Sequence, residues 1–121
     1  MPNEYSRADR LGGQLRRDLA ELIRDEVRDP RVGMVSITEI RVSRDLAHAR
    51  VFITRIGDAA EREPAVAALN HAAGFLRREL GQRLRIRVIP HLRFEYDDVV
   101  EGGMHMENLI AKAVQSDRGD D

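Results

Sequence analysis

Arginine residues gather in one stretch of a sequence whose charges are otherwise balanced. Residues 74–93 hold six arginines and one acidic residue, Glu79, which leaves five net positive charges. A guanidinium group is always charged, and its planar fork of donors matches phosphate oxygens. The stretch is therefore a candidate surface for a phosphate backbone, although a basic surface balanced by acidic patches elsewhere remains the alternative. The candidate phosphate contacts are Arg77, Arg78, Arg83, Arg85 and Arg87, with Arg31 and Arg44 as further candidates on turns.

An acidic run is the second group of side chains that could do chemistry. The sequence EYDDVVE, residues 95–101, carries Glu95, Asp97, Asp98 and Glu101, and carboxylate oxygens are preferred ligands of Ca²⁺. The run lacks the ligand positions of an EF-hand loop, so we interpret it as a solvated turn. A small hydrolase or metal-dependent enzyme that acts through these acids is the rival hypothesis.

Other catalytic and metal-binding chemistry finds little support. The sequence contains no cysteine, which removes thiolate catalysis, disulfides and cysteine-based zinc sites. The few serines lack the surroundings of a nucleophile elbow. The four histidines are scattered without paired ligand spacing, which is typical of surface and turn residues. We expect no enzyme activity, no metal site and no cofactor.

The length and composition limit the organisation of the chain. With 121 residues and 13.8 kDa, one compact domain is expected, and it needs no disulfide or metal for stability. Lysine and arginine number 20 against 21 acidic residues, so the net charge favours no class of partner. No stretch resembles a signal peptide or a membrane span, and we expect a cytoplasmic monomer. The predicted parts are a flexible N-terminus at 1–6, one domain at 7–114 and a disordered tail at 115–121.

Apolar periodicity predicts the elements that must position these side chains. Spacings of three and four residues indicate amphipathic helices, and β-branched residues in alternation indicate strands. The apolar parity changes near Glu39, which a β-bulge explains. Pro90 favours an edge position or a local break in the last strand. The predicted order is a helix at 7–28, strands at 34–43 and 47–54, a helix at 64–84, a strand at 86–96 and a short helix at 104–114.

Gly74 lies in the middle of the helix predicted at 64–84. Glycine costs about 1 kcal/mol relative to alanine inside a helix, and a helix C-cap at this point is the simple explanation. The apolar spacing continues on both sides of Gly74, and the small residues Ala72 and Ala73 precede it. We therefore predict a kink between Asn70 and Phe75 that lets two half-helices bury one core. Replacement of Gly74 by leucine is expected to damage folding or docking.

Several segments together resemble the ribosome-binding factor A family. The matching segments are DPRVG at 29–33, VSITEIRVSRDLAHARVFIT at 35–54, ALNHAAGFLRRELGQRLRIRVIPHLRF at 68–94 and EGGMHMENLI at 101–110. The resemblance implies an α+β, two-layer, type II KH-like fold of order α-β-β-α-α-β. It also implies that the GxxG loop of RNA-binding KH domains is replaced by an AxG kink, here Ala72-Ala73-Gly74. No GxxG occurs in this sequence.

The resemblance also implies a function without catalysis. Such proteins bind the immature 30S subunit and its 16S rRNA, support late maturation including 5′-end processing, and are released with the help of a GTPase. His105 departs from the family, because many members carry arginine there. The arginines named above then become candidate RNA contacts. A protein-interaction module that uses the exposed sheet face without RNA contact is the alternative function.

Overall fold

The computed structural model describes residues 7–101, apart from the side chains of Val100 and Glu101. The predicted helix at 104–114, His105 and both predicted terminal segments lie outside the described residues. The elements in chain order are α1 (Arg7–Glu26), β1 (Val35–Val42), β2 (His48–Arg55), a 3-10 helix (Ala59–Glu61), α2 (Arg62–His71), α3 (Ala73–Arg83), β3 (His91–Tyr96) and α4 (Asp98–Glu101).

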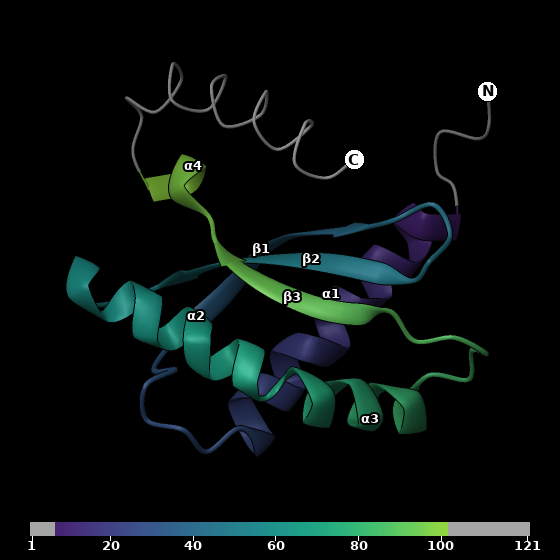
Figure 1. Ribbon diagram of the computed structural model, residues 1–121, viewed down its shortest axis with the longest axis horizontal. Helices are drawn as coiled ribbons and strands as arrows, with labels where there is room; N and C mark the ends of the chain where they lie inside the picture. The colour runs from purple at the N-terminus through teal and green to yellow at the C-terminus, as the bar shows by residue number, and fades with distance from the viewer. Residues whose placement is uncertain (1–6, 102–121) are drawn as a thin grey trace.

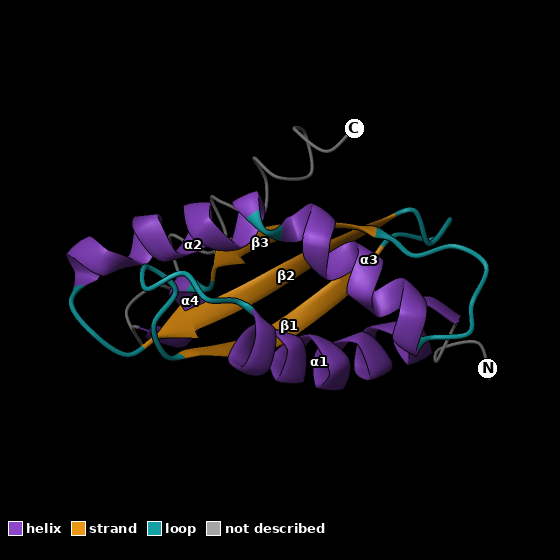
Figure 2. Ribbon diagram, turned by 90° about the horizontal axis from the view of Figure 1, so that it is seen from below, coloured by secondary structure: helices purple, strands orange, loops and turns teal. Residues whose placement is uncertain are grey.

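Two layers make up the domain. The sheet has the strand order β1-β2-β3, in which β1 and β2 are antiparallel and β2 and β3 are parallel. Helices α1, α2 and α3 cover one face of this sheet, and the other face carries none of these three long helices (Figures 1 and 2). The predicted α+β, type II KH-like fold is confirmed, and we call the side of the sheet opposite these three helices the open face. None of the described helices is long and apolar enough to cross a membrane.

The core lies between the helices and the sheet. Helix α1 contributes Leu15, Leu19, Leu22 and Ile23, all buried, as the spacing of three and four residues requires. The helix ends at Glu26, two residues before the predicted end. Phe94 of β3 is the largest fully buried side chain among the described residues, so the core joins the first helix to the last strand of the sheet.

The predicted irregularity in the first hairpin is present. The pairing of β1 with β2 shifts register between Ile37 and Glu39. Ile37 is buried before this shift, and Ile40 and Val42 pack against the core after it. Because one extra residue at a bulge restores the side-chain parity, both halves of β1 turn apolar side chains toward the helices.

The predicted kink is also present, since α2 ends at His71 and α3 begins at Ala73. Ala72 lies between them with φ −87° and ψ 0°, and Ala72 and Ala73 pack against the core. Gly74 is exposed, does not have positive φ, and a Cβ built there would meet nothing within 4 Å. The explanation of Gly74 as a helix C-cap is therefore wrong, because Ala72 is the C-cap of α2, and the structure gives no reason for a folding defect on substitution.

Two predictions about the last part of the domain are wrong. The strand predicted at 86–96 begins only at His91, and Pro90 is buried directly before it. The acidic run, interpreted as a solvated turn, contains the short helix α4. Asp97 precedes this helix, and its Oδ1 accepts a hydrogen bond from the Val99 N–H at 3.1 Å. This side chain therefore caps the first turn.

Candidate nucleic-acid interface

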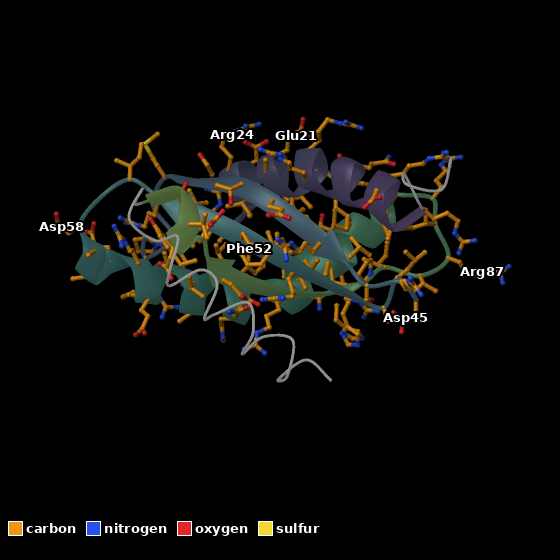
Figure 3. The ribbon with its side chains drawn as sticks, turned by 90° about the horizontal axis from the view of Figure 1, so that it is seen from above. Glu21, Arg24, Asp45, Phe52, Asp58 and Arg87 are labelled. Atoms are coloured by element: carbon orange, nitrogen blue, oxygen red, sulfur yellow. The ribbon has the colours of Figure 1, made fainter. Side chains whose placement is uncertain are left out.

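Three of the predicted arginines lie at one end of the sheet. Arg44 is in the turn between β1 and β2, and Arg85 and Arg87 are in the loop that leads from α3 into β3. The end of this loop lies beside the turn, because the N–H of His91, which begins β3, donates a hydrogen bond to the Ala47 carbonyl at 2.8 Å. Figure 3 shows Arg87 reaching into solvent at the same end as Asp45. We call Arg44, Arg85 and Arg87 the hairpin-end arginines.

The hairpin-end arginines have no side-chain partner in the described part of the chain. All three are exposed, and within residues 7–101 none has a side-chain hydrogen bond or ion pair with another residue. Arg78 on α3 is also exposed and without such a partner in the described part of the chain. Guanidinium groups without carboxylate partners attract phosphate at no cost of a broken ion pair. These four residues are accessible parts of the predicted basic surface, and Arg93 of β3 is likewise exposed without such a partner among the described residues.

Arg77 and Arg83 have structural partners. The Arg77 Nε donates to the Ile89 carbonyl at 3.0 Å and ties α3 to the loop before β3. The Nη1 atom of Arg83 lies 2.7 Å from Oε1 of Glu21 and 3.8 Å from Oδ1 of Asp18, both on α1. The hydrogen bond that Arg83 donates to Glu21, together with the nearby carboxylates, raises the pKa of Arg83. Much of the charge of Arg83 is therefore balanced within the domain.

Arg31 lies far from the hairpin-end arginines. The turn that holds it packs near the other end of β2, because the Arg55 Nε donates to the Val32 carbonyl at 3.0 Å. Arg31 forms a forked pair with Asp29, with Nη2–Oδ2 at 2.7 Å and Nε–Oδ1 at 3.1 Å. The side-chain hydrogen bond from Arg31 is the largest cause that lowers the pKa of Asp29 to about 2. The structure does not bring Arg31 together with the other candidates.

The open face carries a cation-aromatic cluster that the sequence reasoning missed. The guanidinium carbons of Arg41 and Arg50 lie 5.6 and 5.2 Å from the ring centroid of Phe52 (Figure 3 labels this ring). Arg41 forms an ion pair with Glu39, with Nε–Oε2 at 2.7 Å. Arg50 forms an ion pair with Glu95, with Nε–Oε2 at 2.9 Å. The alternation of Arg50 and Phe52 along β2 was the available signal, because residues two apart share one face.

Asn70, beside the kink, was also missed. Its Nδ2 donates to the Phe94 carbonyl at 3.0 Å, and its Oδ1 accepts from the Phe94 N–H at 2.7 Å. β3 pairs with β2 along one edge, so Asn70 supplies hydrogen bonds to the other edge. The kink region is thereby fastened to β3, and the hydrogen bond of Arg77 to Ile89 fastens α3 to the loop that precedes β3.

The acidic run does not assemble a metal site in the described part of the chain. Both oxygens of Glu95 accept hydrogen bonds from Arg50, at 2.9 and 3.0 Å. Asp97 accepts from the Thr38 hydroxyl across the open face and also caps α4. Among the described residues, no group of three or more His, Cys, Asp or Glu could hold a metal ion. These two carboxylates stabilise the fold, and the hydrolase hypothesis finds no site there.

Known sequences similar to this chain agree on one family. The family model described as ribosome-binding factor A matches residues 7–110. The ribosome-binding factor A of Thioalkalivibrio sulfidiphilus is 53% identical over 118 residues, covering 98% of this chain and 92% of that protein. That of Alkalilimnicola ehrlichii is 52% identical over 119 residues, with the same coverage of 98% and 92%.

Solved structures of similar proteins have the same fold. The crystal structure of ribosome-binding factor A from Thermus thermophilus superposes with a TM-score of 0.65 at 31% identity, over 74% of this chain and 94% of that one. A homology model of the Thermus thermophilus factor, fitted into a cryo-electron microscopy map of a 30S complex, superposes with a TM-score of 0.59 at 32% identity. This match covers 69% of this chain and 88% of that one. The family model, the close relatives and the shared fold together establish that this chain belongs to the ribosome-binding factor A family.

Proposed function

We propose that this chain is a non-enzymatic ribosome assembly factor that binds the immature 30S subunit. Membership of the family is the observation that carries the proposal, together with the Thermus thermophilus factor fitted into a map of a 30S complex. The described residues offer accessible cations and no metal cluster. In this role the chain holds RNA in a maturing arrangement in the cytoplasm and catalyses no reaction.

The 16S rRNA is the proposed ligand, and the hairpin-end arginines with Arg78 are the proposed first contacts. A ribosomal subunit presents phosphate groups over much of its surface, and each neutralised phosphate releases bound counterions. The support is the absence of internal partners for these side chains among the described residues. Arg77 and Arg83 are weaker contacts in this proposal, because Ile89 and Glu21 already engage them. Arg31 would need a separate contact from the opposite end of the domain.

The biological consequences follow the family. Binding of this kind supports late maturation of the subunit, including processing at the 5′ end of the 16S rRNA, and ends when a GTPase assists release. Because the factor only binds, loss of the RNA contacts should delay maturation without removing a cleavage activity.

Cosedimentation with immature 30S subunits tests the RNA contacts. The variant carries Arg78→Ala, Arg85→Ala and Arg87→Ala, and binding is measured over a range of salt concentrations. The slope of log affinity against log salt should become shallower by roughly 2 to 3, since each lost phosphate contact contributes about 0.7 to 0.9. Arg28→Ala is the matched control. Arg28 follows the C-terminal end of α1, is exposed, and has no side-chain partner among the described residues. An unchanged slope in the triple variant would remove these arginines from the site.

A protein-interaction module is the second candidate, and the open face is the observation that favours it. Its cations Arg41 and Arg50 are already paired with carboxylates around Phe52, so they are less available to phosphate than the hairpin-end arginines. Cosedimentation that persists after RNase treatment and at moderate salt, and that is lost in Phe52→Ala, would support this function over RNA binding.

A further inference from the structure

The loop between α3 and β3 combines two kinds of exposed side chain. In residues 85–88, the sequence RIRV, Arg85 and Arg87 are exposed, and Ile86 and Val88 are 41% and 49% exposed. Two exposed aliphatic side chains thus alternate with two cations in one short loop, whereas Met34 and Ile56, which are more exposed, lie elsewhere on the described surface. The arginines alone account for attraction to phosphate, but they do not account for the aliphatic residues. We call residues 85–88 the RIRV loop.

Both ends of the RIRV loop are fixed to the domain. On one side Leu84 is buried, and its N–H donates to the Leu80 carbonyl at 2.8 Å. On the other side the Ile89 carbonyl accepts the hydrogen bond from Arg77, and Pro90 is buried. A short loop with anchored ends loses little conformational freedom on binding. The domain therefore presents the four side chains ready for contact.

The rest of the described surface argues against a single-stranded ligand. Proteins that bind single strands stack bases on exposed aromatic rings. Within residues 7–101 every Phe and Tyr side chain is at least partly buried, and the Phe52 ring has guanidinium groups over it. The sequence also lacks the GxxG loop that clamps a single strand in KH domains.

We infer that the RIRV loop binds the minor groove of double-helical RNA, an inference that rests on the proposed binding to the 30S subunit. The minor groove of an A-form helix is wide and shallow and displays riboses and base edges. Ile86 and Val88 pack against this sugar surface, and Arg85 and Arg87 bind phosphates on its rims. The aliphatic residues provide the part of the affinity that salt does not weaken, and the arginines provide the part that it does.

The first experiment separates these two contributions. Full-length Ile86→Ser/Val88→Ser is compared with Met34→Ser/Ile56→Ser, whose replaced side chains are 72% and 73% exposed and lie near the other end of the sheet. Binding to immature 30S subunits should weaken about tenfold in the first variant with an unchanged salt slope, and the control should bind as the unsubstituted protein does. Equal affinity of the two variants would overturn the inference.

The second experiment identifies the RNA structure at the loop. Because the chain has no cysteine, Gln82→Cys gives a unique attachment point for Fe(II)-EDTA on the exposed end of α3, next to the loop and outside it. Hydroxyl radicals should cleave 16S rRNA on two strands that pair with each other across one minor groove. Cleavage confined to an unpaired strand, or its absence in a bound complex, would overturn the inference. Failure of the labelled and unsubstituted proteins to bind 30S subunits would instead refute the proposed function.

Discussion

Replacement of Asn70 by alanine tests how the kink is fastened to the sheet. The substitution removes the hydrogen bonds of 3.0 and 2.7 Å to the carbonyl and N–H of Phe94. A neutral hydrogen bond contributes about 0.5–1.5 kcal/mol, so two contribute about 1–3 kcal/mol. Alanine recovers roughly 0.5 kcal/mol through its higher helix propensity. Asn70 is exposed, so water can reach part of the vacated edge. We therefore expect a net loss of about 1–2 kcal/mol in the free energy of unfolding.

Urea denaturation followed by far-UV circular dichroism measures this loss. With an m value of about 2 kcal/mol/M, the midpoint should fall by roughly 0.5–1 M while m stays the same. Hydrogen exchange should show faster exchange of the Phe94 amide, because its partner at that edge is removed.

His71→Ala is the matched control, since His71 is the exposed neighbour at the same helix end and its side chain has no hydrogen bond in the described structure. The control should stay within about 0.5 kcal/mol of the unsubstituted protein. If Asn70→Ala also stays within that margin, or if protection of the Phe94 amide is unchanged, then Asn70 does not hold β3 in place.

Three further substitutions probe the turns and the kink. Gly33→Ala should destabilise the protein by about 1–2 kcal/mol or more in urea denaturation, because Gly33 has φ +61° and a Cβ there would overlap the Arg55 guanidinium. Gly74→Ala should leave stability unchanged or raise it by up to about 1 kcal/mol, since the site is open; a loss of about 1 kcal/mol in thermal unfolding would contradict this. Asp29→Asn should be less stable than the parent at neutral pH. Arg31 lowers the folded-state pKa of Asp29 from 3.8 to about 2, so this stabilisation is complete above the unfolded value of 3.8 and is lost as the pH falls through about 2. Stability curves that stay equally far apart down to about pH 2 would show that the pair is not responsible.

The helices, the hairpin and the kink were predictable because local patterns decide them. Leucine spacing fixes which side of α1 is buried, and the change of parity near Glu39 requires a bulge wherever β1 has one buried face. The kink was predictable from continuous apolar spacing across a glycine. The residue at which the helix bends was not predictable, because the chain bends at Ala72 and leaves Gly74 exposed to solvent.

The start of β3 could not be read from alternation alone. Residues 86–90 alternate as a strand does, but a strand also needs a partner. His91 pairs with His48, the first residue of β2, so earlier residues would have to pair with the turn between β1 and β2. Pro90 also lacks the N–H that a ladder requires. These residues therefore leave the sheet, and this exposes the RIRV loop.

The sequence by itself determined the α+β class and the presence of a basic segment, because apolar periodicity and charge density are properties of the chain alone. The segments that resemble ribosome-binding factor A indicated the family and its KH-like fold. Only the tertiary structure decided what each arginine does. Arg83 forms ion pairs with carboxylates of α1, Arg77 donates a hydrogen bond to a carbonyl, and Arg31 forms an ion pair with Asp29. Arg85 and Arg87 meet no described partner. The charge of a guanidinium group is the same in all five, but its availability depends on which atoms the fold brings within hydrogen-bond distance.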